Sequence, residues 1–118
     1  MIKLMIGAAV ALCVASGADA ATLRLKNYLA PADDKQRILN TVFLDGVKDG
    51  LIASNVVFAR NGGTPLFCLP ANLVLTPEQT DDIVMREATS RPYPDDMIVS
   101  IVLLAGLRKT FPCGGEKK

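Results

Sequence analysis

The sequence of 118 residues contains no histidine, the side chain that most often serves as a general base, a metal ligand or the partner of a catalytic nucleophile. Its three cysteines form no CxxC pair, so neither a zinc site nor a redox dithiol is expected. A glycine-rich phosphate loop is also missing, because Gly62-Gly63 is not followed by lysine and a helix start. These absences argue against an enzyme and predict no metal and no cofactor.

The net charge also argues against a polyanionic partner. The formal net charge is +1, so the basic excess typical of nucleic-acid binding is absent and no nucleic-acid partner is expected. Three acidic pairs, Asp33-Asp34, Asp81-Asp82 and Asp95-Asp96, lie where helices are expected to begin. Carboxylates there complement the helix dipole, which favours a structural role over acid–base or calcium chemistry.

The N-terminus has the pattern of a secretory signal peptide over residues 1–20. Lys3 precedes an apolar run over residues 4–16, and Ala18-Asp19-Ala20 is a small-x-small cleavage pattern. The run is shorter than the roughly 20 residues of an ordinary membrane span. We therefore expect a periplasmic protein with one domain over residues 21–118 and no membrane association in its mature form. An uncleaved N-terminal anchor is the alternative.

Cleavage would remove Cys13 and leave only Cys68 and Cys113. An oxidising compartment favours their pairing, and two cysteines allow one connectivity. The predicted disulfide would close the last two helical segments into one lobe.

Helical patterns dominate the rest of the chain, although residues 21–34 fit either an extended lead-in or a frayed helical turn. A helix is predicted from Lys35, with Asp33 or Asp34 as N-cap, to Phe58 or Ala59, before Asn61-Gly62-Gly63. Its apolar residues on neighbouring turns are Ile38, Leu39, Val42, Phe43, Val47, Leu51 and Ile52.

Gly46 and Gly50 are four residues apart and therefore share one face of this helix. Each glycine costs about 1 kcal/mol relative to alanine. A close crossing by a partner helix would explain them; a hinge or a ligand approach is the alternative.

Thr76-Pro77-Glu78-Gln79 has the features of a helix start, with a threonine cap, proline at the first position and a glutamine that returns a bond. The helix should end before Pro92. We expect Ile83 and Val84 to face inward and four polar residues to be exposed: Asp81, Asp82, Arg86 and Glu87.

The final apolar run, Met97 to Leu107, lacks strand alternation and predicts a buried helix with Asp95-Asp96 in its first turn and Arg108-Lys109 in its last. A buried strand is the rival interpretation. The predicted fold is all-α, a small compact bundle of about four helices with one disulfide.

The turn between the last two helices is the candidate partner-binding surface, through Arg91, Tyr93 and Asp95. Tyr93 lies between two prolines in a stiff segment, and arginine and tyrosine are enriched among binding hot spots. The alternative is that Tyr93 only staples two helices together.

The order of these signals resembles the Rap/Tai family of type VI secretion immunity proteins. The resemblance runs from Ile38 to Cys113 and is carried by residues 44–50 (LDGVKDG), Phe67-Cys68-Leu69-Pro70, the Thr76 helix start and Phe111-Pro112-Cys113. It implies an all-helical periplasmic protein that binds a peptidoglycan-cleaving amidase toxin and blocks its active site, often as a homodimer. It also implies a structural disulfide between the two cysteines.

Two functions of different classes follow. The first is a binding protein of the immunity type that catalyses nothing. The second is a small envelope stress or holdase-type periplasmic chaperone, which would also be helical, exported and joined by one disulfide.

Overall fold

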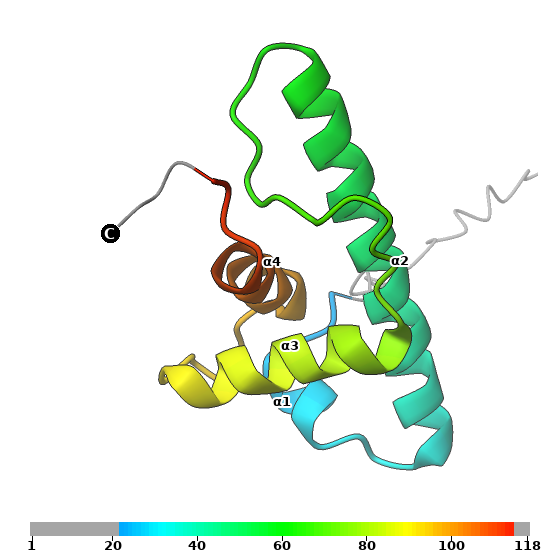
Figure 1. Cartoon of the computed structure of the whole chain (residues 1–118). Helices are drawn as coiled ribbons and strands as arrows, with labels where there is room; N and C mark the ends of the chain where they lie inside the picture. Colours follow the sequence, from blue (N-terminus) through cyan, green and yellow to red (C-terminus); the bar gives the residue numbers. More distant parts are fainter. Residues whose placement is uncertain (1–21, 115–118) are drawn as a thin grey trace, which may run out of the picture.

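The structure, a computed structural model, describes residues 22–114 and contains four helices in that range. They are α1 (Leu25–Leu29), α2 (Asp34–Arg60), α3 (Pro77–Ser90) and α4 (Val99–Thr110) (Figure 1). The only strand-like pairing in this range is a single bridge between Arg24 and Ile98. The all-α prediction is therefore confirmed, whereas the predicted signal peptide over residues 1–20 lies outside the described residues.

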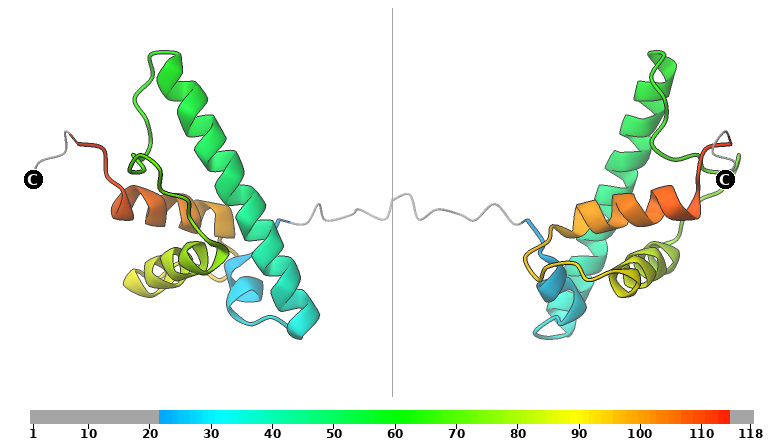
Figure 2. Two further views of the ribbon diagram at one scale, coloured as in Figure 1. Left: turned by 45° about the vertical axis from the view of Figure 1, so that its right-hand side comes forward. Right: turned by 90° about the vertical axis from the view of Figure 1, so that its left-hand side faces the viewer.

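Helices α3 and α4 pack against each other, and α2 runs along one side of the pair (Figures 1 and 2). The C-terminal half of α2 projects beyond the pair, and the α2–α3 connection (residues 61–76) returns beside it (Figure 2). The buried core draws on every helix and on the connection: Leu25, Tyr28, Leu44, Phe67, Leu75, Ile83, Val84, Val99, Val102, Leu103 and Leu107.

The close helix crossing occurs at Gly106 in α4. A Cβ added there would lie 2.6 Å from Ile83 Cγ2 and 3.1 Å from the Ile83 carbonyl oxygen, so α3 approaches α4 where the side chain is missing. The predicted crossing at Gly46 and Gly50 is wrong for the described chain, because a Cβ at either glycine would meet no atom within 4 Å. Both glycines lie on the exposed outer face of α2.

Helix starts follow their local sequence. The Asp33 carboxylate caps α2 by accepting from the Gln36 amide at 2.7 Å. At α3 the Thr76 hydroxyl accepts from the Gln79 amide at 3.2 Å, and the Gln79 side chain accepts from the Thr76 amide at 2.9 Å. The predicted capping box is confirmed.

Helix α4 begins later than predicted, at Val99. Asp95 and Asp96 therefore precede the helix instead of occupying its first turn. The reason is a contact distant in sequence, in which the Leu25 amide donates to the Met97 carbonyl at 2.8 Å and the Val99 amide donates to the Leu23 carbonyl at 3.0 Å. Residues 22–29 accordingly combine both alternatives, a short extended segment followed by the helical turn α1.

The acidic pair Asp81-Asp82 is also not at a helix start as predicted, because both residues lie in the second turn of α3. The Tyr28 hydroxyl donates to the Asp81 carboxylate, which fastens α1 to α3. Burial, with smaller contributions from this hydrogen bond and from the charge of Asp81, raises the pKa of Tyr28 well above its usual range.

The disulfide between Cys68 and Cys113 is confirmed, with an S–S distance of 2.07 Å. Beside it, the Cys68 amide donates to the Phe111 carbonyl at 2.8 Å. The same connection is held to α2 by Asn55, whose side chain donates to the Phe67 carbonyl and accepts from the Leu66 amide, both at 2.7 Å. The connection is thus fixed from two sides, by α2 and by the C-terminal segment.

Lys48 holds the end of the connection nearest α3. Its buried ammonium donates to the Leu75 carbonyl at 3.3 Å and pairs with Asp45 at 2.7 Å and Asp49 at 3.2 Å. The hydrogen bond to Asp45 raises the pKa of Lys48, and burial opposes this effect.

None of the seven apolar residues predicted for α2 is fully buried in the core. Phe43, Val47, Leu51 and Ile52 are half-buried against it. Ile38, Leu39 and Val42 are 64%, 51% and 65% exposed.

Among the described residues, no helix is both long enough and apolar enough to cross a membrane.

Candidate functional site

The predicted partner-binding residues lie where α3 ends and the chain turns toward α4. Arg91 is the C-cap of α3 in an extended conformation, and the Tyr93 amide donates to the Arg91 carbonyl at 3.0 Å. Farther along the turn, the Lys26 amide donates to the Asp95 carbonyl at 3.1 Å, and the Arg24 guanidinium donates to the Asp96 carbonyl at 2.9 Å. Both ends of the turn are therefore anchored, one by α3 and one by the segment around α1.

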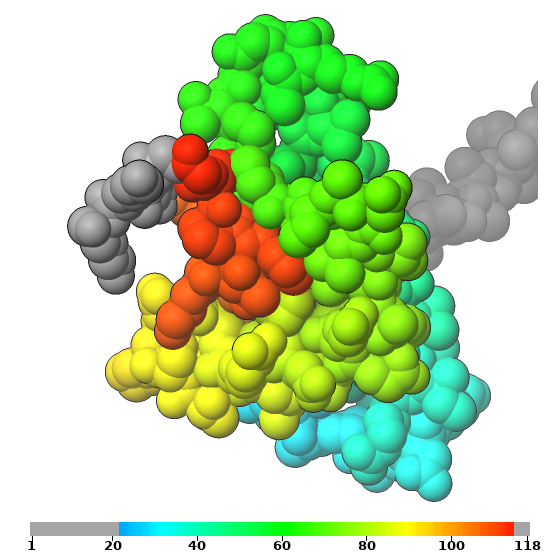
Figure 3. All heavy atoms as spheres, in the orientation of Figure 1, coloured from blue at the N-terminus to red at the C-terminus, as the bar shows by residue number. Residues whose placement is uncertain are grey.

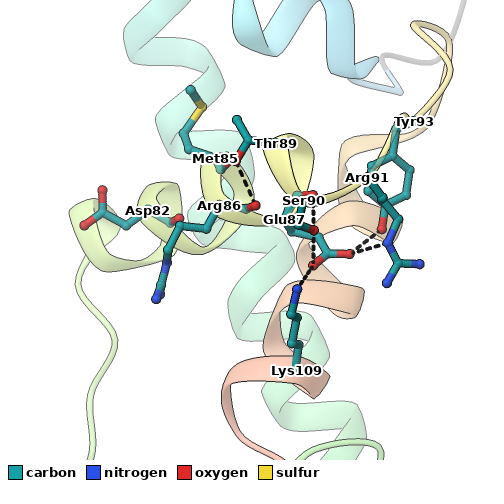
Figure 4. Close-up of polar contacts among 9 residues, drawn as sticks. All are labelled: Asp82, Met85, Arg86, Glu87, Thr89, Ser90, Arg91, Tyr93 and Lys109. Carbon is teal, nitrogen blue, oxygen red and sulfur yellow. Dashed lines mark hydrogen bonds and ion pairs between the residues drawn. The ribbon is translucent and has the colours of Figure 1, made fainter.

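A buried carboxylate, that of Glu87, organises this turn (Figure 4). The Tyr93 hydroxyl donates to its Oε1 at 2.6 Å, and the Ser90 hydroxyl lies 3.3 Å from its Oε2. Arg91 Nε pairs with Oε1 at 3.1 Å, and Lys109 Nζ lies 4.0 Å from Oε2. The carboxylate thus joins α3, the turn and α4.

The predicted exposure of Glu87 is wrong, because the residue is only 2% exposed. A buried carboxylate is tolerated when hydrogen-bond donors and cations surround it, and two hydroxyls and two cations do so here. The position of Glu87 in the sequence indicated its burial, although its charge suggested exposure. Glu87 is four residues after the buried Ile83 and therefore lies on the same helical face.

Tyr93 is half-buried, and its hydroxyl is engaged within the chain. Burial first, and the hydrogen bond to Glu87 second, raise the pKa of Tyr93. The Arg91 guanidinium lies over the ring, 5.5 Å from its centre. The tyrosine hydroxyl therefore ties the turn to α3, and the ring contacts Arg91.

The structure brings two of the three predicted residues together. Arg91 and Tyr93 are in contact, and the Arg91 side chain is 58% exposed. Asp95 is exposed farther along the turn, where its carbonyl accepts from the Lys26 amide. Glu87 and Lys109, which hold the turn from behind, were not predicted as part of this site.

Among residues 22–114, no group of three or more acidic or cysteine side chains is placed to hold a metal ion. The surface instead offers a guanidinium, part of a phenol ring and a carboxylate on a turn that hydrogen bonds keep in one conformation.

The model of the Rap1a immunity proteins matches residues 7–113. The chain belongs to the Rap1a immunity protein family. The match covers the full region from Ile38 to Cys113 in which the sequence signals resemble this family, and it includes both cysteines of the disulfide. No curated protein and no solved structure matches the chain.

Membership of the Rap1a family identifies the chain as an immunity-type protein. This class is generally non-enzymatic and acts by binding a toxin partner. Its disulfide-closed helical body is the scaffold that carries the turn at Arg91 and Tyr93.

Proposed function

We propose that the mature chain is a periplasmic immunity protein that binds a secreted peptidoglycan amidase and blocks its active-site cleft. The observation that carries this proposal is the family match over residues 7–113. The signal-peptide pattern over residues 1–20 supports a periplasmic location, where such an amidase would act on the cell that makes it. Recognition, without chemistry on the immunity protein's side, is all that this role requires.

The turn at Arg91, Tyr93 and Asp95 is the proposed contact surface. Interfaces draw much of their affinity from arginine and tyrosine, and a contact that is already ordered loses little entropy on binding. The hydrogen bond from Tyr93 to Glu87 and the two flanking prolines supply that order. Asp95 adds an exposed carboxylate at the far end of the turn.

Native co-purification from periplasm tests the function. A single stoichiometric hydrolase that loses activity in the complex is the expected result. A broad list of client proteins, captured mainly at low pH, would instead identify an envelope chaperone. Recovery of neither class of protein would contradict both functions.

Two substitutions at one position test the contact surface. Tyr93→Ala should weaken binding of that hydrolase by about tenfold or more, because it removes a whole hot-spot ring. Tyr93→Phe keeps the ring and removes only the hydrogen bond to Glu87, so it should weaken binding less than Tyr93→Ala does. Equal affinity of wild type and Tyr93→Ala, in a folded protein, would place the contact elsewhere.

We also propose that two copies of the chain pair through the outer face of α2. Ile38, Leu39 and Val42 are more than half exposed there, next to the open positions Gly46 and Gly50. Exposed apolar residues beside two glycines suit a close helix crossing, and no helix of the described chain provides it. A second α2 would bring an identical face to a two-fold interface.

Sedimentation of Gly46→Leu tests this pairing. The open space around Gly46 accepts leucine within one chain, so the variant should fold yet remain monomeric where wild type is dimeric. Ala71→Leu, which adds the same side chain at an exposed position of the α2–α3 connection, should not change the dimer. A monomeric wild type, or a dimeric Gly46→Leu, would contradict pairing through this face.

A further inference from the structure

A hollow of about 810 Å³ lies beside the disulfide, where three segments meet. Residues 64–66 of the α2–α3 connection form one wall, the last turn of α4 and residues 112–114 form another, and Arg91 at the end of α3 forms the third. Figure 3 shows these atoms of α4 and the segment after it, in orange and red, between the green connection and the yellow end of α3. We call this the cationic hollow, because arginine and lysine side chains line it.

Among residues 22–114, three cations and no carboxylate line the hollow: Arg91, Arg108 and Lys109. Arg91 and Lys109 share one carboxylate, that of the buried Glu87 behind them. Arg108 is exposed and forms no ion pair within the part of the chain that the structure describes. The positive charge of this surface is therefore only partly compensated.

The helix termini account for part of this charge but not for all of it. Arg108 and Lys109 lie in the last turn of α4, where cations offset the helix dipole, and Arg91 caps α3 in the same way. Each helix end carries about half a negative charge. Two such ends and one glutamate still leave the three cations with a positive excess, directed at a single concave surface.

We propose that the cationic hollow binds a carboxylate-rich segment of a protein partner. Arg108 supplies the guanidinium that forms no pair within the described chain, and Leu66 and Ala105 supply apolar wall for the stem of an acidic side chain. The hollow is far larger than one inorganic anion and lies open at the surface, which suits a peptide segment. This inference rests on the proposed function only for the identity of the partner, which would be the toxin.

Other anionic ligands fit these observations less well. Binding to nucleic acid draws its affinity from many phosphate contacts, whereas this hollow has three cations and the chain has a net charge of only +1. Stable docking on an anionic lipid surface takes a larger polybasic cluster than three residues.

Fluorescence anisotropy with a labelled hexaglutamate peptide tests the proposal on the mature, oxidised chain. Arg108→Glu should weaken binding by about tenfold or more, since reversal replaces an attraction with a repulsion. Lys35→Glu makes the same charge change at the exposed start of α2 and should alter the affinity less than about twofold. Arg108→Lys should restore most of the affinity. A hexaglutamine peptide should not bind.

Several results would overturn the inference. Equal weakening by Lys35→Glu would show a response to net charge alone. Competition by inorganic phosphate at the same concentration as hexaglutamate would show a general anion site. Arg108-dependent binding to phosphatidylglycerol vesicles without binding to hexaglutamate would show a lipid site. None of these results depends on recovering a toxin, so a failure here is distinct from a failure of the immunity function.

Discussion

Two regions of the molecule, the lobe formed by α3 and α4 and the outer face of α2, carry the same types of residue. The lobe buries them, and the outer face exposes them. In the lobe, Val84, Val99, Val102, Leu103 and Leu107 are fully buried. On the outer face of α2, the three apolar residues Ile38, Leu39 and Val42 are more than half exposed. Glycine differs in the same way, since Gly106 admits a neighbouring helix and Gly46 faces open space.

This contrast indicates a division between a part that folds the chain and a part that is available to another molecule. Each fully buried aliphatic side chain contributes about 1.5–3 kcal/mol on burial, so the lobe accounts for much of the stability of a domain this small. Apolar residues that remain more than half exposed contribute little to that total. Substitutions in the lobe should change stability, and substitutions on the outer face should change association.

Loss of the disulfide should have the largest effect on stability. Cys68 and Cys113 are 45 residues apart, and on the chain-entropy model a loop of that size is worth about 4 kcal/mol. Reduction should therefore lower the denaturant midpoint strongly. The double variant Cys68→Ser/Cys113→Ser, which does not respond to reductant, is the control. A wild-type unfolding curve that barely shifts on reduction would place the stability of the lobe in its packing alone.

Removal of the Glu87 carboxylate should have the next largest effect. Glu87→Ala leaves the Tyr93 hydroxyl without its acceptor and separates Arg91 and Lys109 from their shared partner, for a loss of about 2 kcal/mol. Glu78→Ala, an exposed glutamate in the first turn of the same helix, should cost about 0.5 kcal/mol or less. Chemical denaturation measures both variants, and equal losses would mean that the buried network adds no stability.

Local sequence predicted what depends on local chemistry. The cap at Asp33 and the capping box at Thr76 involve groups three residues apart, so their residue types are sufficient evidence. The disulfide was also predicted, since cleavage of the expected signal peptide would leave two cysteines and one possible pair. The turn at Arg91 and Tyr93 was also predicted from local sequence, because its prolines interrupt the helix.

Local sequence does not predict contacts between distant segments. The start of α4 depends on hydrogen bonds to Leu23 and Leu25, more than 70 residues earlier in the chain, and no motif near Met97 announces them. Gly46 and Gly50 alone did not show whether their face of α2 meets the core or solvent. Glu87 is the exception, because its spacing from Ile83 indicated burial while its charge suggested exposure.

The two glycine positions should respond to alanine in opposite directions, each by about 1 kcal/mol. Gly46→Ala should stabilise the chain, because alanine is the better helix former and the space is open. Gly106→Ala gains the same propensity but places a methyl group against Ile83, and overpacking typically costs about 1–3 kcal/mol. Thermal melts of both variants at low protein concentration, where association is minimal, compare the two faces directly. Stabilisation by both substitutions would remove the distinction between the crossing and the open face.

Alkaline pH should produce the smallest change, and it should act on the lobe's polar anchors. Tyr28 and Tyr93, the only tyrosines in the chain, have raised pKa values through burial and hydrogen bonds to carboxylates, and the ion pair with Asp45 raises the pKa of Lys48. Raised folded-state values mean that the unfolded chain loses these protons first. Stability should therefore be complete below about pH 9 and fall as pH rises above about 10.

The magnitude is bounded by ionisation of the unfolded chain. At pH 10 about half of the unfolded phenols are charged, which limits the loss to about 0.4 kcal/mol for each tyrosine. Denaturation of the double variant Tyr28→Phe/Tyr93→Phe between pH 8 and 10 should show a flatter profile than wild type. A wild-type profile without any alkaline decline would mean that the two hydroxyls ionise as readily in the folded protein as in the unfolded chain, and that their bonds to Asp81 and Glu87 do not hold α1 and the turn to α3 in solution.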